Sequence, residues 1–396
     1  MDFQIKYEIL TSGTQQENMD LFLRDIITTI ERAKQQGTFL VKLTFFLDDS
    51  VAGSSEQKRG YISNTLSNHL QDQTPPIVFI AQAPQEDAHS AVELTYVTSA
   101  QNGTTLTMKS FDRFQYAIIE HKKSKWLFLG LDNHHVPVFD FNTKVHETFR
   151  VAGQILEAEY MNFSNVIRQW NYIENITTTT QELSGEYQNY QIFNDIRATF
   201  YEKSKLRSDF PAATGIGCTS GGFALELIAL NGCDTFQRVS IKSPVQANAY
   251  DYSKEVLIGN AVHPVTKQAP LFERAKLVVF KDSAIALISG TAAISGEKSI
   301  HIPDTATQTE ITIKNILELL TQKNLNLNGV NRVIKDIQIA YLRVYVKNKA
   351  DNDRVSAVCR KYFTNIPILL VQSDVCRSEL LVEIEAAFNC HFLPID

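Results

Sequence analysis

One pattern recurs three times along the chain and limits the folds that the chain can adopt. Each copy consists of a proline, a short apolar strand, a polar loop, and a second apolar strand that contains a glutamate. The proline–glutamate pairs are Pro76 and Glu93, Pro211 and Glu226, and Pro367 and Glu383. The two residues of each pair are 15 to 17 positions apart. Self-similarity over such long intervals indicates three related structural units rather than a solenoid of short repeats.

The segments before each proline extend the pattern. A short amphipathic helix precedes the proline, a strand-like run precedes that helix, and a longer amphipathic helix comes earlier still, as in "NMDLFLRDIITTIERAKQ". This order predicts an α+β fold in which two helices cover one face of a mixed sheet. We expect units at 1–98, 99–245 and 246–396, with the first unit diverged and shortened at its start. Because no linker rich in proline, glycine or serine separates them, the units should pack into one body.

Overall composition excludes several classes of protein. The formal charge of −6 is mild and spread along the chain, which argues against a nucleic-acid partner. No apolar run approaches the roughly 20 residues of a membrane helix, and the N-terminus lacks the pattern of a secretory signal. Five scattered cysteines do not form a disulfide framework, so we expect a cytoplasmic protein. Neither a metal-ligand spacing nor a dinucleotide motif is present, and we expect no cofactor.

The final strand, in "LLVEIEAAF", carries two carboxylates on one face. Strand residues alternate between faces, so Glu383 and Glu385 point the same way. A carboxylate in an apolar strand is costly to bury unless it is paired or used. The residues alone leave two interpretations of Glu383 open, a hydrogen-bonded structural group, which is the more common case, or a catalytic acid. Glu385 is expected to be supporting structure.

Several stretches together resemble a known family. They include "RQWNYIENI", "YQIFNDIRATFY", "FPAATGIGC", "LFERAKLV", "LISGTAAISGEKSIH", "LRVYVKN" and "VCRSELLVEIEA", and they run from about Val145 to Ala387. This combination resembles the chorismatases and, more broadly, the Rid/YjgF superfamily, whose members are trimers of a small α+β unit with clefts between subunits. The resemblance implies a pseudo-trimer of three Rid/YjgF-like units in one monomeric chain. It also implies cleavage of chorismate, the expected small-molecule partner, to pyruvate and a ring acid.

The resemblance assigns roles to individual residues. Glu383 matches the acid that protonates the methylene carbon of the enolpyruvyl ether, and burial would keep such an acid protonated near neutral pH. Cys376 and Gly290 match residues that accompany formation of 3-hydroxybenzoate. The remaining expected substrate contacts are Ser289, Arg343, Arg197, Tyr172, Tyr250 and Tyr345. Arginine suits the two carboxylates of chorismate. One departure is Lys267 or Gln268, where the family tends to have arginine.

Each of these residues also has a plain structural explanation. Cys376 could be a small buried apolar group, Gly290 part of a tight turn, Arg197 a solvated helix charge and Arg343 an edge-strand charge, while tyrosines at strand spacing are usually core. Four functions therefore stay open. They are 3-hydroxybenzoate formation, which we favour, a hydrolytic chorismatase giving a dihydroxy-cyclohexadiene acid or mixed 3- and 4-hydroxybenzoates, an imine hydrolase, and a non-catalytic metabolite-binding protein.

Overall fold

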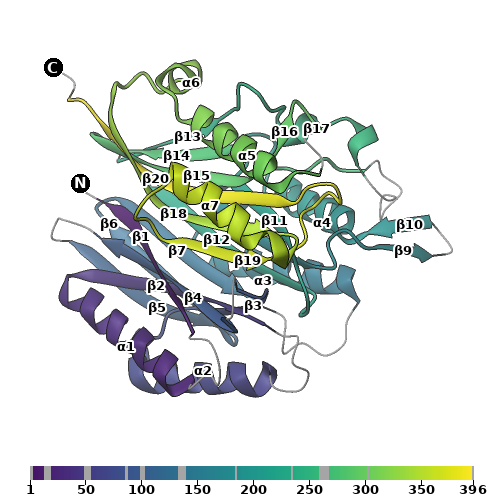
Figure 1. Ribbon diagram of the computed structural model, residues 1–396. Coiled ribbons are helices and arrows are strands. Elements are labelled where there is room, and N and C mark those ends of the chain that lie inside the picture. Colours follow the sequence, from purple (N-terminus) through teal and green to yellow (C-terminus); the bar gives the residue numbers. More distant parts are fainter. Residues whose placement is uncertain are drawn as a thin grey trace.

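The computed structural model in Figure 1 describes most of the 396-residue chain. The described residues are 3–12, 19–48, 55–84, 88–98, 103–132, 140–182, 185–232, 235–257, 267–300 and 303–394. Three sheets of four, six and six strands account for the body of the molecule.

The first unit is a four-stranded sheet with two helices. Its elements are β1 (Gln4–Thr11), α1 (Met19–Gln35), β2 (Thr38–Leu47), α2 (Ser55–Leu70), β3 (Ile77–Ala81) and β4 (Ser90–Thr98). The strand order is β1-β4-β2-β3. Only β2 and β3, which α2 connects, are parallel, as a helical crossover requires.

The middle unit repeats this arrangement and adds two strands at one edge. Its elements are β5 (Thr104–Phe111), β6 (Phe114–His121), β7 (Ser124–Leu131), α3 (Phe141–Ala158), β8 (Val166–Glu174), the small hairpin β9 (Thr179–Glu182) and β10 (Gly185–Gln188), α4 (Asn189–Lys203), β11 (Ala212–Cys218) and β12 (Phe223–Gly232). The strand order is β11-β8-β12-β7-β6-β5. The hairpin strands β5, β6 and β7 open this unit.

The third unit has the same plan. Its elements are β13 (Gln237–Ile241), β14 (Ala275–Val279), β15 (Ser283–Ala292), the short pair β16 (Ile294–Ser295) and β17 (Lys298–Ser299), α5 (Thr305–Leu319), α6 (Gln322–Leu327), β18 (Ile334–Val346), α7 (Asn352–Tyr362), β19 (Ile368–Gln372) and β20 (Val382–Phe392). The strand order is β13-β14-β15-β20-β18-β19. Strand β13 pairs with β14, so this sheet begins before residue 246, where we expected the unit to start.

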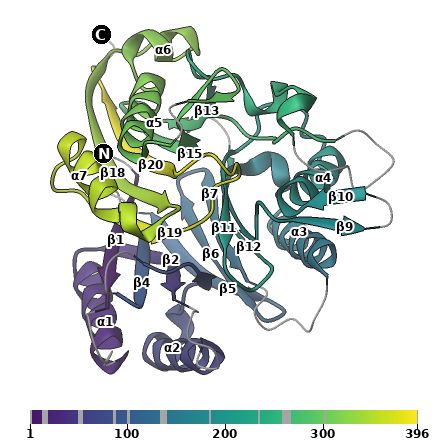
Figure 2. The ribbon, with the colours of Figure 1, turned by 45° about the vertical axis from the view of Figure 1, so that its right-hand side comes forward.

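The three sheets share one four-stranded core. The strand orders β1-β4-β2-β3, β7-β12-β8-β11 and β15-β20-β18-β19 are equivalent, and each contains one parallel pair joined by a helix. The helices α1 and α2, α3 and α4, and α5 and α7 lie on different sides of the molecule, outside the sheets (Figures 1 and 2). Separate apolar clusters lie under the helix pairs, and one shared cluster joins the inner faces of all three sheets. The predicted α+β pseudo-trimer in one chain is confirmed.

A buried polar network lies between the inner faces of the sheets. Glu93 on β4 pairs in register with Thr44 on β2, and Glu226 on β12 pairs with Trp170 on β8. The residue at the equivalent position of β20 is Glu385, which is opposite Arg343 on β18. The expectation that Glu383 is the third equivalent glutamate is therefore wrong. The proline-to-glutamate interval misleads because it includes a loop whose length differs between units.

Three cations neutralise these three carboxylates. Lys42 Nζ lies 2.6 Å from Glu226, and Arg168 Nη2 lies 2.8 Å from Glu385. Arg343 bridges two units, because its Nη2 lies 2.8 Å from Glu93 and its Nη1 lies 3.2 Å from Glu385. Removing one member of such a buried pair typically costs about 3–5 kcal/mol, since the other charge is left unpaired. The network therefore holds the three units in a fixed arrangement.

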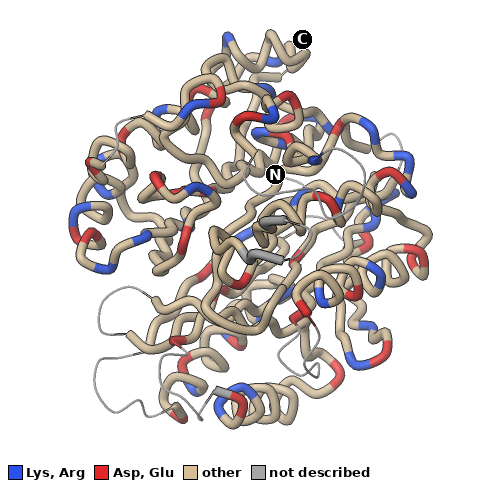
Figure 3. The backbone as a smooth tube through the Cα atoms, turned by 90° about the vertical axis from the view of Figure 1, so that its right-hand side faces the viewer, with Lys and Arg blue, Asp and Glu red and all other residues tan. Residues whose placement is uncertain are grey.

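Charged residues of both signs are spread over the fold. Figure 3 shows lysine and arginine interspersed with aspartate and glutamate along the chain rather than gathered on one side of this view. None of the described helices combines the length and the apolar character that crossing a membrane requires.

Candidate active site

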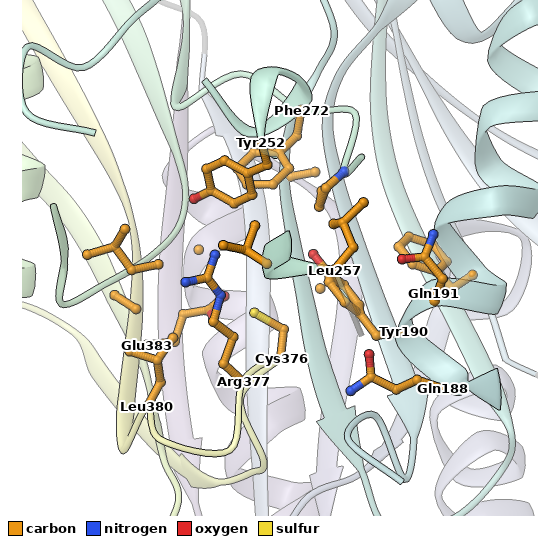
Figure 4. Close-up of a pocket in the computed structure, with 18 of the residues that line it drawn as sticks. Gln188, Tyr190, Gln191, Tyr252, Leu257, Phe272, Cys376, Arg377, Leu380 and Glu383 are labelled. Carbon is orange, nitrogen blue, oxygen red and sulfur yellow. The ribbon is translucent and has the colours of Figure 1, made fainter. Parts of the chain in front are cut away.

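A cavity lies where the middle and third units meet (Figure 4). The middle unit contributes residues of α4 and β11, and the third unit contributes β15, β20 and the segment before β20. The charged and sulfur-containing side chains of its lining are Arg197, Arg274, Arg377, Glu383 and Cys376. Most of the remaining lining residues are aromatic or aliphatic. A mostly apolar hollow with a few convergent charged groups is typical of a small-molecule site.

Glu383 is the one carboxylate in this lining. It is only 5% exposed. Among the residues that the structure describes, none donates a hydrogen bond to its carboxyl group. Burial, followed by the negative charge of Glu385, raises its pKa to about 8, while Arg168 and Arg274 act in the opposite direction. A buried carboxyl group without hydrogen-bond donors keeps its proton because the ionised form is not solvated. Glu383 is therefore a protonated acid at neutral pH.

Gly290 on β15 makes room for this acid. A Cβ atom at this position would lie 1.9 Å from Glu383 Oε1, so any side chain here would displace the carboxyl group. The pairing of β15 with β20 is irregular around this point, between Ile288 and Thr291. The neighbouring Ser289 lies behind the cavity wall, where its Oγ accepts from the Ala213 N–H at 2.9 Å. Ser289 thus links β15 to β11 instead of facing the cavity.

Cys376 lies on the segment before β20 and faces the cavity near Glu383 (Figure 4). Burial, followed by the nearby Glu383, raises the pKa of its thiol to about 12. The thiol is therefore neutral at physiological pH and lacks the thiolate character of a cysteine nucleophile. In this place Cys376 acts as a small, weakly polar wall.

Arg197 is a buried cation in the cavity lining. Its side chain is 2% exposed, and Nη2 donates to Asn194 Oδ1 at 2.7 Å. Its Nε has no hydrogen-bond partner. Burial lowers the pKa of its guanidinium, and no carboxylate among the described residues forms an ion pair with it. An unpaired buried charge is costly, so this position is suited to an anionic ligand.

Two further arginines line the cavity beside Tyr252. Arg274 donates from Nη2 to the Tyr252 hydroxyl at 2.7 Å, and from Nε and Nη2 to the carbonyl of Ala247. Arg377 donates from Nη1 to the carbonyl of Glu297 at 2.7 Å. Both guanidinium groups lie over the Tyr252 ring, at 5.6 and 5.3 Å. Neither forms an ion pair with a described carboxylate, so both keep positive charge available to the cavity.

The sequence analysis did not identify Arg274, Tyr190 and Tyr252. The signal for Arg274 was present, since the "LFERA" stretch places an arginine beside an apolar strand. Tyr190 and Tyr252 carry no comparable signal, because they lie in polar stretches far apart in the chain and meet only in the folded protein (Figure 4).

Besides Ser289, four predicted substrate contacts lie outside the cavity lining. Arg343, Tyr172 and Tyr345 belong to the central network, where Arg343 Nη1 donates to the Tyr172 hydroxyl at 2.7 Å and the Tyr345 hydroxyl donates to Glu385 at 3.2 Å. Tyr250 packs against Phe210 and is outside the cavity lining. The assignment of these side chains to the substrate cleft is corrected. Tyr172, Arg343 and Tyr345 are on the inner faces of β8 and β18, which point toward the other sheets, and Tyr250 is outside the lining.

Lys267 and Gln268, where the sequence departs from the family pattern, lie beside the cavity. Lys267 Nζ donates to the Leu257 carbonyl at 2.9 Å, and the Gln268 N–H donates to Asp195 at 3.0 Å. Both residues thus fix the chain beside the cavity.

Comparisons with known proteins show what this fold and sequence resemble. A crystal structure of a chorismatase matches 97% of this chain and 99% of its own chain with a TM-score of 0.64 and 20% sequence identity. Residues 105–229 match the family model described as chorismatase FkbO/Hyg5-like, N-terminal. The chain therefore has the fold of a chorismatase, and about a third of its sequence matches a chorismatase family model.

Two curated proteins are similar to this chain in sequence. The chain is 33% identical to a 3-hydroxybenzoate synthase of Streptomyces hygroscopicus over 233 residues, which are 57% of this chain and 64% of that protein. It is 29% identical to a chorismatase of the same organism over 231 residues, which are 57% of this chain and 62% of that protein. The chain thus spans less than two thirds of the length of these relatives.

Proposed function

We propose that this protein cleaves chorismate to 3-hydroxybenzoate and pyruvate. The observation that carries the proposal is Glu383, a buried acid with a pKa of about 8 in a cavity that otherwise presents positive charge. A protonated carboxyl group has no evident structural task there, since it makes no hydrogen bond to a described residue. The similarity to a 3-hydroxybenzoate synthase supports the choice of product.

The cavity suits the charge and shape of chorismate. Chorismate carries two carboxylates on a compact ring, and the planar guanidinium group is the side chain best adapted to carboxylates. Arg197 can hold one carboxylate, and Arg274 with Arg377 can hold the other. Tyr190 and Tyr252 provide aromatic surface for the ring between them.

In the first step Glu383 protonates the methylene carbon of the enolpyruvyl ether. A carbon of this kind is a weak base, so the acid must be protonated at neutral pH and held close to it. The proton converts the ether to an oxocarbenium ion, which makes the pyruvyl oxygen a good leaving group. Glu383 is left ionised, and the neighbouring arginines offset the new negative charge.

In the second step the ring hydroxyl beside the ether displaces pyruvate from the ring carbon. Its oxygen bonds to that carbon as the ether C–O bond breaks, and pyruvate leaves with the ether oxygen as its keto group. Loss of a ring proton then restores aromaticity and opens the C–O bond at the original hydroxyl position. One proton has entered and one has left, so chorismate and the two products contain the same atoms and no water is consumed.

Gly290 and Cys376 favour this internal route over hydrolysis. Gly290 lets the carboxyl group of Glu383 sit against β15, and the neutral Cys376 thiol supplies a wall without a strong water ligand. A substrate that fits closely against these residues leaves little room for a water molecule at the reacting carbon.

The decisive experiment is incubation of the purified protein with chorismate in water enriched in oxygen-18. We expect pyruvate and 3-hydroxybenzoate in equal amounts, with no heavy oxygen in the hydroxybenzoate. The Glu383→Gln variant is the control, and we expect its turnover to fall by about 10²–10⁴-fold. A dihydroxy-cyclohexadiene acid as the main product would point to hydrolysis, and unchanged turnover in the variant would contradict the mechanism.

A further inference from the structure

Glu385 lies two residues after Glu383 on the same face of β20, but its surroundings differ. Its Oε2 accepts hydrogen bonds from Arg168 Nη2 at 2.8 Å and from Thr214 Oγ1 at 2.6 Å, and its Oε1 accepts from Trp170 Nε1 at 2.6 Å. These contacts and the charge of Arg343 lower the pKa of Glu385 despite its burial. Two adjacent carboxyl groups on one strand face are therefore in opposite protonation states at neutral pH.

Thr214 on β11 connects the ionised group to the protonated one. Its Oγ1 donates to Glu385 and accepts from the backbone N–H of Gly290 at 3.0 Å and from Arg168 at 2.7 Å. Gly290 is also the residue whose missing side chain makes room for Glu383. One hydroxyl of the middle unit thus fixes the ionised carboxylate and the wall behind the acid in the third unit.

The other two units contain a glutamate equivalent to Glu385 but no residue equivalent to the acid Glu383. Glu93 and Glu226 occupy the positions equivalent to Glu385, as the strand register shows. Two residues before them stand Ala91 and Ala224, where the third unit has Glu383. The glutamate of the central network is therefore common to all units, and only in the third unit does it have an acid beside it.

We propose that Glu385 is a positioning residue whose fixed negative charge, held by Arg168 and Thr214 of the middle unit, keeps Glu383 protonated for proton transfer. This inference rests on the proposed function and adds the residue that sets the pH range in which the proposed reaction runs. Because the cations that hold Glu385 come partly from another unit, the acid is ready only when the units are assembled.

Several neighbouring groups influence the pKa of Glu383, and their relative strengths decide whether that pKa rises or falls when Glu385 is replaced. The charged and titratable groups that face it are Glu385, Arg168, Arg274, Cys376 and Tyr190. After burial, the charge of Glu385 is the largest influence that raises the pKa of Glu383, and it is stronger than the opposing influence of Arg168 or of Arg274 taken singly. The Cys376 and Tyr190 side chains are neutral at working pH, since burial raises both of their pKa values.

The test compares Glu385→Gln with Glu226→Gln. Both changes remove one buried carboxylate of the central network, but only Glu385 adjoins the acid. In Glu385→Gln we expect the alkaline limb of the pH–rate profile to move down by about one pH unit, so that relative activity above the limb falls about tenfold. In Glu226→Gln the limb should stay where it is in the parent.

A second measurement follows the protonation of Glu383 directly and does not require enzyme activity. The infrared band of the protonated Glu383 carboxyl group, assigned by its loss in Glu383→Gln, should disappear at lower pH in Glu385→Gln than in the parent. If that variant does not fold, the double variant Glu385→Gln/Arg168→Gln removes one charge of each sign. It should shift the band the same way, because Glu385 is the stronger influence.

The outcomes separate this inference from the proposed function. A Glu383 band that titrates at the parent pH in the Glu385 variants overturns the inference, as does an equal shift in Glu226→Gln. Full turnover in Glu383→Gln would instead overturn the proposed function, whatever the band does.

Discussion

The buried acid should make the protein less stable as the pH rises. The pKa of Glu383 is raised from 4.5 to about 8. Between these values the unfolded chain is ionised at this residue and the native protein is protonated, so unfolding releases a proton and becomes easier with each pH unit. The full interval corresponds to about 5 kcal/mol, at about 1.4 kcal/mol per pH unit. Glu383→Gln removes this dependence.

Urea unfolding between pH 5 and pH 9 measures the effect. The free energy of unfolding of Glu383→Gln, minus that of the parent, should grow by about 1.4 kcal/mol per pH unit up to about pH 8 and then stay constant. Glu226→Gln is the matched control. The pKa of Glu226 is lowered, so its stabilising contribution is lost only as pH falls, and its difference from the parent should be flat over this range. A flat difference for Glu383→Gln would refute the protonated acid.

Three further changes test the site and the assembly. In steady-state kinetics, Arg197→Met should raise the KM for chorismate more than it lowers kcat, because the lost cation binds substrate in the ground and transition states alike. In thermal unfolding the variant should lose no stability, because the cation that it removes is buried and unpaired. Arg343→Met should instead lower the free energy of unfolding by about 3–5 kcal/mol, because it leaves the buried Glu93 unpaired. The KM of the folded protein should not change. An increased KM at full stability would return Arg343 to the substrate site. Cys376→Ala should keep pyruvate release while moving the ring product toward the hydrolysed acid, which product analysis by mass detects. Sedimentation should find a monomer, because the clefts of a trimer are already formed within one chain, and an obligate trimer would contradict this.

The sequence by itself determined the units and their plan. Hydrophobic periodicity and the repeated proline–strand–glutamate pattern predicted three α+β units, because each helix and strand must bury one face and the pattern reports which residues do so. The same logic singled out Glu383, since a carboxylate within an apolar strand is unusual wherever the strand packs. The resemblance then linked Glu383, Cys376, Gly290 and Arg197, and all four line one cavity.

Only the tertiary structure decided what covers each buried face. Arg343 interrupts an apolar strand, as a substrate-binding residue would, but its face of β18 meets the other sheets, and its charge is used by Glu93 and Glu385. Hydrophobic periodicity cannot distinguish a side chain that faces a ligand cleft from one that faces another sheet, because both lie on a face that the sequence pattern marks as buried. The convergence of Arg274 and Arg377 on one cavity was likewise beyond the sequence, although the "LFERA" stretch marked Arg274 itself, because the two residues lie in segments far apart in the chain. The working state of Glu383 depends on the same convergence, because the charges that set its pKa come from two different units.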